Sequence, residues 1–278
     1  MCKVLKVSTS GFYAWIRKKE STRERENQVL LEAIIAIHQK SNRVYGSPKI
    51  LKALKRTETY KNVALNHKKV ERLMKENDLR SKTVKKYKAT TNSQHNLPVA
   101  ENLLNRNFQA ERPNEKLVSD ITYVSTDEGW LYVAAINDLF GDYNIGLAMS
   151  TRMSKDLAIR ALKDAYRRGG KPHDTLIHSD RGSQYCSKEY QRLLKAYGYR
   201  CSMSRKGNCW DNAPMESFWG KMKMEWLNEL HFKTIEEAKK MVFEYVLIFH
   251  NRQRLHAAFG YQTPYEVYQA KISCKSAF

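Results

Sequence analysis

Apolar residues in the first third of the chain recur at helical spacing. This pattern predicts a helix over residues 24–39, preceded by two short helical pieces over residues 5–19 that break at Ser8–Gly11. Two further helices are expected, the first capped by Ser47 and the second by Asn66. Their apolar stripes, in chain order, are Val29, Leu30, Ala33, Ile34 and Ile37; Ile50, Leu51 and Leu54; and Val70, Leu73 and Met74. The front of the chain is therefore predicted to be helical.

The helix after Asn66 is basic on the faces that do not point inward. Its basic side chains are Lys68, Lys69, Arg72 and Lys75. Two short helices with a basic second helix fit a helix-turn-helix, which lays that helix on DNA. A solvated surface helix is the alternative, because charged faces are common. We predict that residues 1–80 form a helical DNA-binding region.

A polar and basic stretch without helical or strand periodicity follows. We interpret residues 81–113 as an extended linker. Lys85 and Lys86 belong to a cluster of four lysines within it, a pattern typical of a segment that follows a phosphate backbone.

From residue 114 the pattern changes to strands. Runs rich in Val, Ile and Tyr at 115–124, 130–138 and 145–150 are separated by short turns and predict an antiparallel meander. The later elements are predicted as a helix at 154–168, a strand at 175–180, a helix at 187–197, a strand at 199–204 and a helix that carries Glu216. This order predicts a mixed α/β sheet, within a domain over residues 114–270.

Charge separates the two halves of the chain. The net charge is +20; residues 1–113 hold 25 basic and 10 acidic side chains, and residues 114–278 hold 24 and 19. A basic front half indicates that nucleic acid is bound there. The chain is 42% hydrophobic, yet it lacks an apolar run long enough for a membrane span, and its five cysteines lack metal-site spacing. We therefore expect a cytoplasmic protein with no membrane partner.

Three acidic residues stand out in the second half. Asp120 lies inside the first predicted strand, where a charge is costly unless it is paired or liganded. Asp180 ends a short apolar strand, at the edge where α/β sheets bind ligands. Glu216 opens a helix otherwise rich in Trp, Phe, Met and Lys. Each acid has a structural alternative: a strand-edge charge, a turn former and a helix-dipole acid, respectively.

Three converging carboxylates without His or Cys suit an oxygen-preferring ion, Mg²⁺ or Mn²⁺. Two such ions about 4 Å apart stabilise both the attacking and the leaving oxygen of a phosphodiester displacement. We therefore expect two ions bound by Asp120, Asp180 and Glu216. Tyr123 and Tyr185 lie near these acids in the sequence, and we interpret them as packing or DNA-stacking residues.

Several motifs together resemble a known family. "VSDITYV", "HSDRGSQY" and "GNCWDNAPMESFWGKMKME" are similar to the DDE catalytic core shared by retroviral integrases and insertion-sequence transposases, most of all to the second-frame protein of two-reading-frame, copy-out paste-in elements. The front motif "VSTSGFYAW" and the tail "HNRQRLHAAFGYQTPYE" extend this resemblance over nearly the whole chain. The tail departs from the family at His250, where Tyr is common, and at Phe259, where Leu is usual.

The resemblance implies a bacterial transposase with an RNase H-like core, a five-stranded mixed sheet with helices. Its glutamate, here Glu216, is the third metal ligand, and the lysine seven residues on, Lys223, touches substrate DNA. We also expect Arg254, in the matching tail, to contact DNA. The implied partners are double-stranded DNA, as terminal inverted repeats and target, and further copies of the chain once DNA is bound.

Two other functions remain open from the sequence. A nuclease of the same fold would share the acids and the ions but lack strand transfer. A catalytically inactive DNA-binding regulator would need none of the acids. The long basic front region argues against the first.

Overall fold

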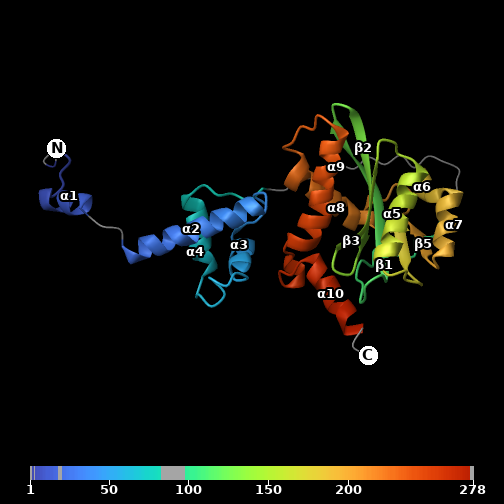
Figure 1. Cartoon of the computed structure of the whole chain (residues 1–278), viewed down its shortest axis with the longest axis horizontal. Coiled ribbons are helices and arrows are strands. Elements are labelled where there is room, and N and C mark those ends of the chain that lie inside the picture. Colours follow the sequence, from blue (N-terminus) through green and yellow to red (C-terminus); the bar gives the residue numbers. More distant parts are fainter. Residues whose placement is uncertain (1, 3, 18–20, 83–97, 276–278) are drawn as a thin grey trace. The chain divides into compact units, whose positions relative to one another are not determined.

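Two compact units make up the chain, Met1–Ser81 and Lys82–Phe278, and each is described by itself. The structure is a computed structural model (Figure 1). It describes residues 2, 4–17, 21–82 and 98–275. The predicted phosphate contacts of Lys85 and Lys86 lie outside the described residues.

The first unit is helical, as the apolar spacing predicts. Its helices are α1 (Thr9–Ile16), α2 (Thr22–Lys40), α3 (Ser47–Leu54) and α4 (His67–Glu76). The predicted break at Ser8–Gly11 is wrong in extent. The hydroxyl of Ser8 accepts a hydrogen bond from the backbone N–H of Gly11, so Ser8 caps α1 and Gly11 lies inside its first turn. Residues 4–6 form turns, not the first of two helical pieces.

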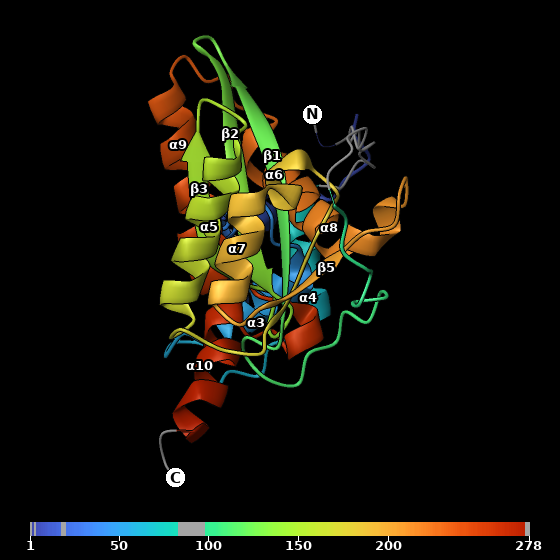
Figure 2. The same ribbon diagram turned by 90° about the vertical axis from the view of Figure 1, so that its right-hand side faces the viewer.

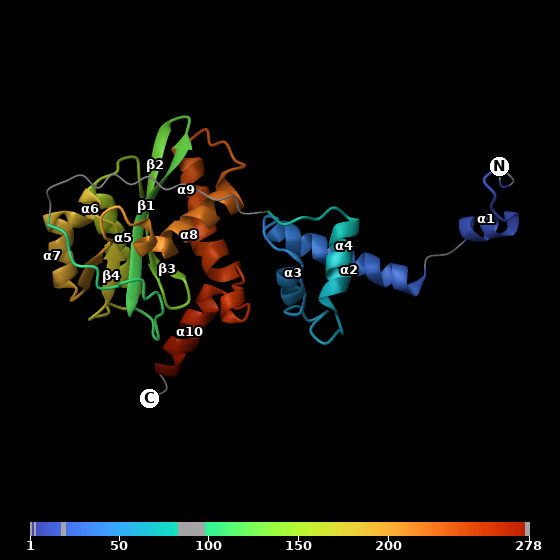
Figure 3. The ribbon, with the colours of Figure 1, turned by 180° about the vertical axis from the view of Figure 1, so that it is seen from behind.

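Helices α2, α3 and α4 pack against one another in a small core (Figure 3). The stripe of α4 is buried as predicted. The stripe of α2 is shifted, because Val29 is 59% exposed and His38 is buried instead. Helix α3 begins one residue earlier than predicted, since Gly46 occupies the cap position and Ser47 is already helical. The prediction for Asn66 is confirmed: its side chain accepts a hydrogen bond from the N–H of Lys68 at 3.0 Å.

The second unit is built on one mixed sheet. Its strands are β1 (Lys116–Thr126), β2 (Gly129–Asp138), β3 (Tyr143–Ser150), β4 (Leu176–Ser179) and β5 (Arg200–Met203). Their order is β3-β2-β1-β4-β5. The first three strands pair antiparallel, whereas β4 and β5 run parallel to β1. The prediction of a five-stranded mixed sheet is thereby confirmed.

Helices cover both faces of this sheet (Figure 1). Helices α5 (Lys155–Arg168), α6 (Ser183–Cys186) and α7 (Lys188–Ala196) lie on one face, and α8 (Ala213–Met222) and α9 (Ile235–Phe243) lie on the other. Gly146 on β3 lets α5 approach closely, because a Cβ there would lie 2.5 Å from the carbonyl oxygen of Ala161.

The helical chain after Glu216 changes its winding. Helix α8 continues as a π-helical segment over Lys223–Leu227, and α9 continues as another over Glu244–Gln253. A short 3₁₀ turn (Ala257–Phe259) and α10 (Pro264–Lys275) follow. Met215, Phe218, Trp219 and Met222 are buried as predicted, but Trp226 is only half-buried because the wider π-helical turn shifts the spacing. Among the described helices, none has the length and apolar character needed to cross a bilayer.

Register places the middle of β1 at an opening in the sheet. Strand β4 pairs with Lys116, Leu117 and Val118 of β1, whereas β2 pairs with β1 as far as Thr126. Beyond Val118 the β4 side of β1 is therefore clear of the β4 ladder. Asp120 lies two residues past that point.

Candidate active site

Three different elements bring the three acids to this opening. Asp120 is on β1, and Asp180 follows directly after β4, the parallel neighbour of β1. Glu216 lies in the first turn of α8, and α8 contacts β1. The fold therefore brings together acidic residues that are almost a hundred positions apart in the sequence.

The electrostatics of Asp120 show that the acids share one locality. Burial raises the pKa of Asp120 well above its usual range, and the nearby carboxylates of Asp180 and Glu216 raise it further. Burial also raises the pKa of Glu216. Repulsion between like charges in a poorly solvated place is costly, and a bound cation would relieve it.

Two hydrogen bonds orient the aspartates. The indole Nε1–H of Trp219 donates to Oδ2 of Asp120 at 3.1 Å. The backbone N–H of Gly182 donates to Oδ1 of Asp180 at 2.9 Å. From its sequence position, Trp219 is predicted only as part of the apolar stripe of α8. Its spacing of three residues from Glu216, which puts both side chains on neighbouring faces, is the signal for this second role.

Lys223 lies at the same site. Burial lowers the pKa of Lys223, and the carboxylate of Asp120 acts in the opposite direction. Its Nζ is 4.9 Å from the centroid of the Tyr123 ring. Glu216 and Lys223 therefore both face the Asp120 region, although the helix becomes π-helical at Lys223.

The residues just before α8 fasten it to the rest of the site. The side-chain N–H of Asn212 donates to the backbone carbonyl of Ser119, next to Asp120, at 3.2 Å. Asp211 is buried and accepts hydrogen bonds from Arg205, Arg106 and Asn102. Hydrogen bonds from Arg205 hold the pKa of Asp211 well below its usual range. Neither residue was predicted from the sequence; the signal available was an Asp–Asn pair directly before a helix with Pro in its first turn.

The residues present fit an oxygen-preferring divalent cation. The candidate donors are three carboxylates that repel one another, a set that Mg²⁺ and Mn²⁺ bind in proteins. They do not form a group whose ligand atoms all lie within 4.8 Å of one another. Oxygens about 2.1 Å from one ion are at most about 4.2 Å apart, so sharing an ion requires these side chains to turn toward each other.

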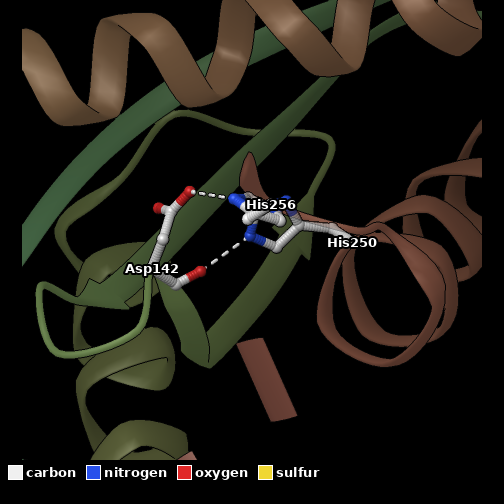
Figure 4. Close-up of side chains that lie close together, drawn as sticks. All are labelled: Asp142, His250 and His256. Carbon is white, nitrogen blue, oxygen red and sulfur yellow. Dashed lines mark hydrogen bonds and ion pairs between the residues drawn. The ribbon is translucent and has the colours of Figure 1, made fainter. Parts of the chain in front are cut away.

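Another cluster in the described residues does lie within 4.8 Å: Asp142, His250 and His256 (Figure 4). Three of its four ring nitrogens have a polar partner, whereas Nδ1 of His250 is buried without a hydrogen-bond partner. Nε2 of His250 lies 2.8 Å from the backbone carbonyl of Asp142 and so carries a proton. Nε2 of His256 lies 3.3 Å from Nη1 of Arg254 and so accepts, which leaves the proton on Nδ1, 3.7 Å from the Asp142 carboxylate. We interpret the cluster as a structural link between the β2–β3 turn and the tail.

Arg254 is unavailable to DNA, contrary to the prediction. The side chain is buried, and its guanidinium forms a forked ion pair with Glu225, with Nε 2.9 Å from Oε2 and Nη2 2.5 Å from Oε1. Tyr245 donates to the same carboxylate at 2.8 Å. The sequence shows that Arg254 is basic, but it does not show that Arg254 pairs with Glu225, which lies 29 positions earlier in the chain.

The two tyrosines near the acids differ. Tyr185 is buried, and its hydroxyl is 3.0 Å from Oγ of Ser119, so it is a packing residue. Tyr123 is 40% exposed. On α4, Lys68, Arg72 and Lys75 are exposed and Lys69 is half-buried, so the predicted DNA-contact side chains reach solvent.

Comparisons with known proteins agree with this architecture. Residues 110–209 and 197–264 match two families described as integrase core domain, and residues 24–87 match an HTH-like domain. The chain is 44% identical, over 95% of its length and 96% of the relative, to the "insertion element IS600 uncharacterized 31 kDa protein" of Shigella sonnei. It is 40% identical, over 95% of its length and 91% of the relative, to transposase InsF for insertion sequence IS3A of Escherichia coli (strain K12).

A solved structure is also similar. The HTLV-2 integrase catalytic core domain aligns with a TM-score of 0.45 and 18% identity, covering 58% of this chain and 99% of that domain.

Proposed function

This chain belongs to the family of IS3 insertion-sequence transposases, and we propose that Asp120, Asp180 and Glu216 are the residues with which it cuts and joins DNA. One observation carries the assignment: Asp120 on β1, Asp180 directly after the neighbouring strand β4 and Glu216 in the first turn of α8, which contacts β1, come together. In agreement with this placement, burial raises the pKa of Asp120, and the carboxylates of Asp180 and Glu216 raise it further.

The proposed chemistry has two steps. A water oxygen attacks a phosphodiester at the end of the element, the phosphorus–O3′ bond breaks, and a 3′-hydroxyl is released. That 3′ oxygen then attacks a second phosphodiester, forming a new phosphorus–oxygen bond and releasing another 3′-hydroxyl. Neither step requires a covalent bond to the protein.

Asp120, Asp180 and Glu216 would hold Mg²⁺ or Mn²⁺, two ions per site, and the ions would stabilise the attacking and leaving oxygens. The protein's own part is to fix the acids. Trp219 orients Asp120, and Asn212 ties the start of α8 to β1. These contacts support a site whose ligands sit on rigid elements of the core.

The proposed substrates are the terminal inverted repeats of the element and the target DNA, bound by the first unit and by an assembly of several copies. The three functions open from the sequence are separated by one assay. The full chain is incubated with labelled element-end duplex and Mn²⁺. Joined products are expected; cleavage alone would indicate a nuclease, and binding alone would indicate an inactive regulator. Either of the latter results would overturn the proposal.

Neutralising the basic face of α4 should weaken DNA binding. Alanine at Lys68, Lys69 and Arg72 removes three charges, so the slope of log affinity against log salt should fall by about three if each contacts a phosphate. The measurement is fluorescence anisotropy of the full chain with element-end duplex at graded salt. A variant lacking Lys163, Lys188 and Lys195, exposed lysines of the second unit, is the matched control. Equal slopes in the two variants would place the DNA contact elsewhere.

Lys223→Ala should raise the DNA concentration needed for strand transfer. The ammonium lies near Asp120, where it is placed to meet a phosphate next to the reacting one. Mn²⁺ affinity and melting temperature should stay close to those of the unsubstituted chain. Strand transfer at graded DNA concentrations checks this. Unchanged activity at low DNA would remove Lys223 from the DNA contact, and lost Mn²⁺ binding would show that the helix had moved.

A further inference from the structure

Two large aromatic side chains are exposed together on the β1–β2 hairpin. Tyr123 is 40% exposed and Trp130 is 49% exposed. Trp130 pairs with Ser125, so Tyr123 and Trp130 are diagonal neighbours on the same face of the hairpin. Their ring centroids are 5.0 Å apart and the planes are nearly perpendicular, at 89°. Figure 2 shows the end of this hairpin extending past α5 and α7, which cover the rest of that face.

The pair adjoins the candidate active site. Tyr123 is three residues from Asp120 on β1, so their Cα atoms are about 10 Å apart at the usual strand rise. Lys223, which interacts electrostatically with Asp120, lies over the Tyr123 ring with its Nζ 4.9 Å from the centroid. Asp120 and Tyr123 are an odd number of residues apart and point to opposite faces of β1, and Lys223 is the side chain that interacts with both.

Trp130 is the ring that offers an open face. Lys223 occupies one face of Tyr123, and in a perpendicular pair either the edge of Trp130 meets the other face of Tyr123 or the edge of Tyr123 meets one face of Trp130. In both arrangements Tyr123 covers at most one face of Trp130, and the residue is 49% exposed. The edge contact with Tyr123 fixes the orientation of the indole.

We propose that Trp130 stacks on one unpaired base of the DNA substrate close to the candidate active site; this rests on the proposed function of the three acids. The outside of a duplex presents phosphates, sugars and base edges, so an aromatic face meets a base face only where a base is unpaired or terminal. Lys223, over the Tyr123 ring, suits a phosphate of the same DNA strand. The alternative role for the pair is stabilisation of the hairpin itself.

The test uses a base that reports stacking. An element-end duplex carries a single unpaired 2-aminopurine at the 3′ end, and its fluorescence is measured with the full chain in EDTA, so that no DNA is cut. The unsubstituted chain should quench the fluorescence severalfold. Trp130→Ala should abolish the quenching, and Trp130→Phe should keep most of it. Phe243→Ala, which removes an exposed aromatic residue of α9, should behave like the unsubstituted chain.

Strand transfer completes the test. Because stacking on an aromatic side chain is worth about 1–3 kcal/mol per base, Trp130→Ala should lower strand transfer about 5- to 150-fold, with Trp130→Phe largely restoring it. Persistent quenching in Trp130→Ala would overturn the proposal. An equal loss of strand transfer in Trp130→Ala and Trp130→Phe, with a matching fall in melting temperature, would also overturn it, because that result indicates that Trp130 stabilises the hairpin. Asp120→Asn should still quench the 2-aminopurine fluorescence but should be inactive in strand transfer. Failure of base stacking on Trp130 and failure of the acid assignment are therefore distinguishable.

Discussion

Asp120→Asn, Asp180→Asn and Glu216→Gln should each reduce cleavage and strand transfer by about a thousandfold or more, while DNA binding stays nearly unchanged. Each substitution removes a negative charge and almost no volume. When several residues act as one catalytic unit, removing any one of them abolishes most of the rate enhancement. The three single variants should therefore be about equally inactive. Cleavage and joining of labelled element-end DNA, measured beside anisotropy of the same DNA, separate chemistry from binding.

Asp142→Asn is the control for these variants, because it changes a carboxylate to an amide in the second cluster of the same domain. It should retain cleavage and strand transfer. Substantial activity in one of the three acid variants would remove that acid from the site. Loss of DNA binding in all three would mean that they disturb the fold and not the chemistry.

Arg254→Ala should lower the free energy of unfolding by about 3–5 kcal/mol, because it leaves the buried carboxylate of Glu225 without its forked partner. Glu225 lies in the π-helical segment that continues α8, and Tyr245 and Arg254 both hydrogen-bond to it. The pair therefore anchors the helix that carries Glu216 to the tail. Denaturant unfolding measures the change.

Arg200→Ala provides the comparison, since Arg200 pairs with Asp174 in solvent, where both side chains are more than half exposed. Its cost should be below about 1 kcal/mol. Combining Glu225→Leu with Arg254→Met should cost less than the sum of the two single changes, because no charge is left buried alone. A cost for Arg254→Ala as small as that for Arg200→Ala would contradict the anchoring role.

Local patterns predicted the parts of the fold that depend on near neighbours. The cap at Asn66 and the buried stripe of α4 follow from residues within one helix, and the strand runs of the sheet follow from apolar residues between short turns. The comparisons and the sheet order confirm the fold and the family. The sequence did not predict that Val29 of α2 is exposed and His38 is buried. The position of the neighbouring helices, and not spacing alone, decides which face of α2 is buried.

The sequence indicated the candidate acids of the site but not the contacts that hold them. Asp120, Asp180 and Glu216 were indicated by element type and order, and by resemblance. The hydrogen bond from Trp219 to Asp120 and the bond from Asn212 to the carbonyl of Ser119 join residues about a hundred positions apart. The partner of Arg254 is likewise distant along the chain. Pairings of this kind depend on how elements meet in space, so composition and periodicity do not contain them.

Mn²⁺ binding by the full chain, followed by electron paramagnetic resonance, tests most directly whether Asp120, Asp180 and Glu216 form one metal site. The unsubstituted chain should bind Mn²⁺, and Asp120→Asn, Asp180→Asn and Glu216→Gln should each weaken binding by at least about tenfold, since each removes a ligand. Asp142→Asn should leave the affinity unchanged. Unchanged affinity in the three acid variants, or loss of binding in Asp142→Asn, would contradict the account and place the metal elsewhere.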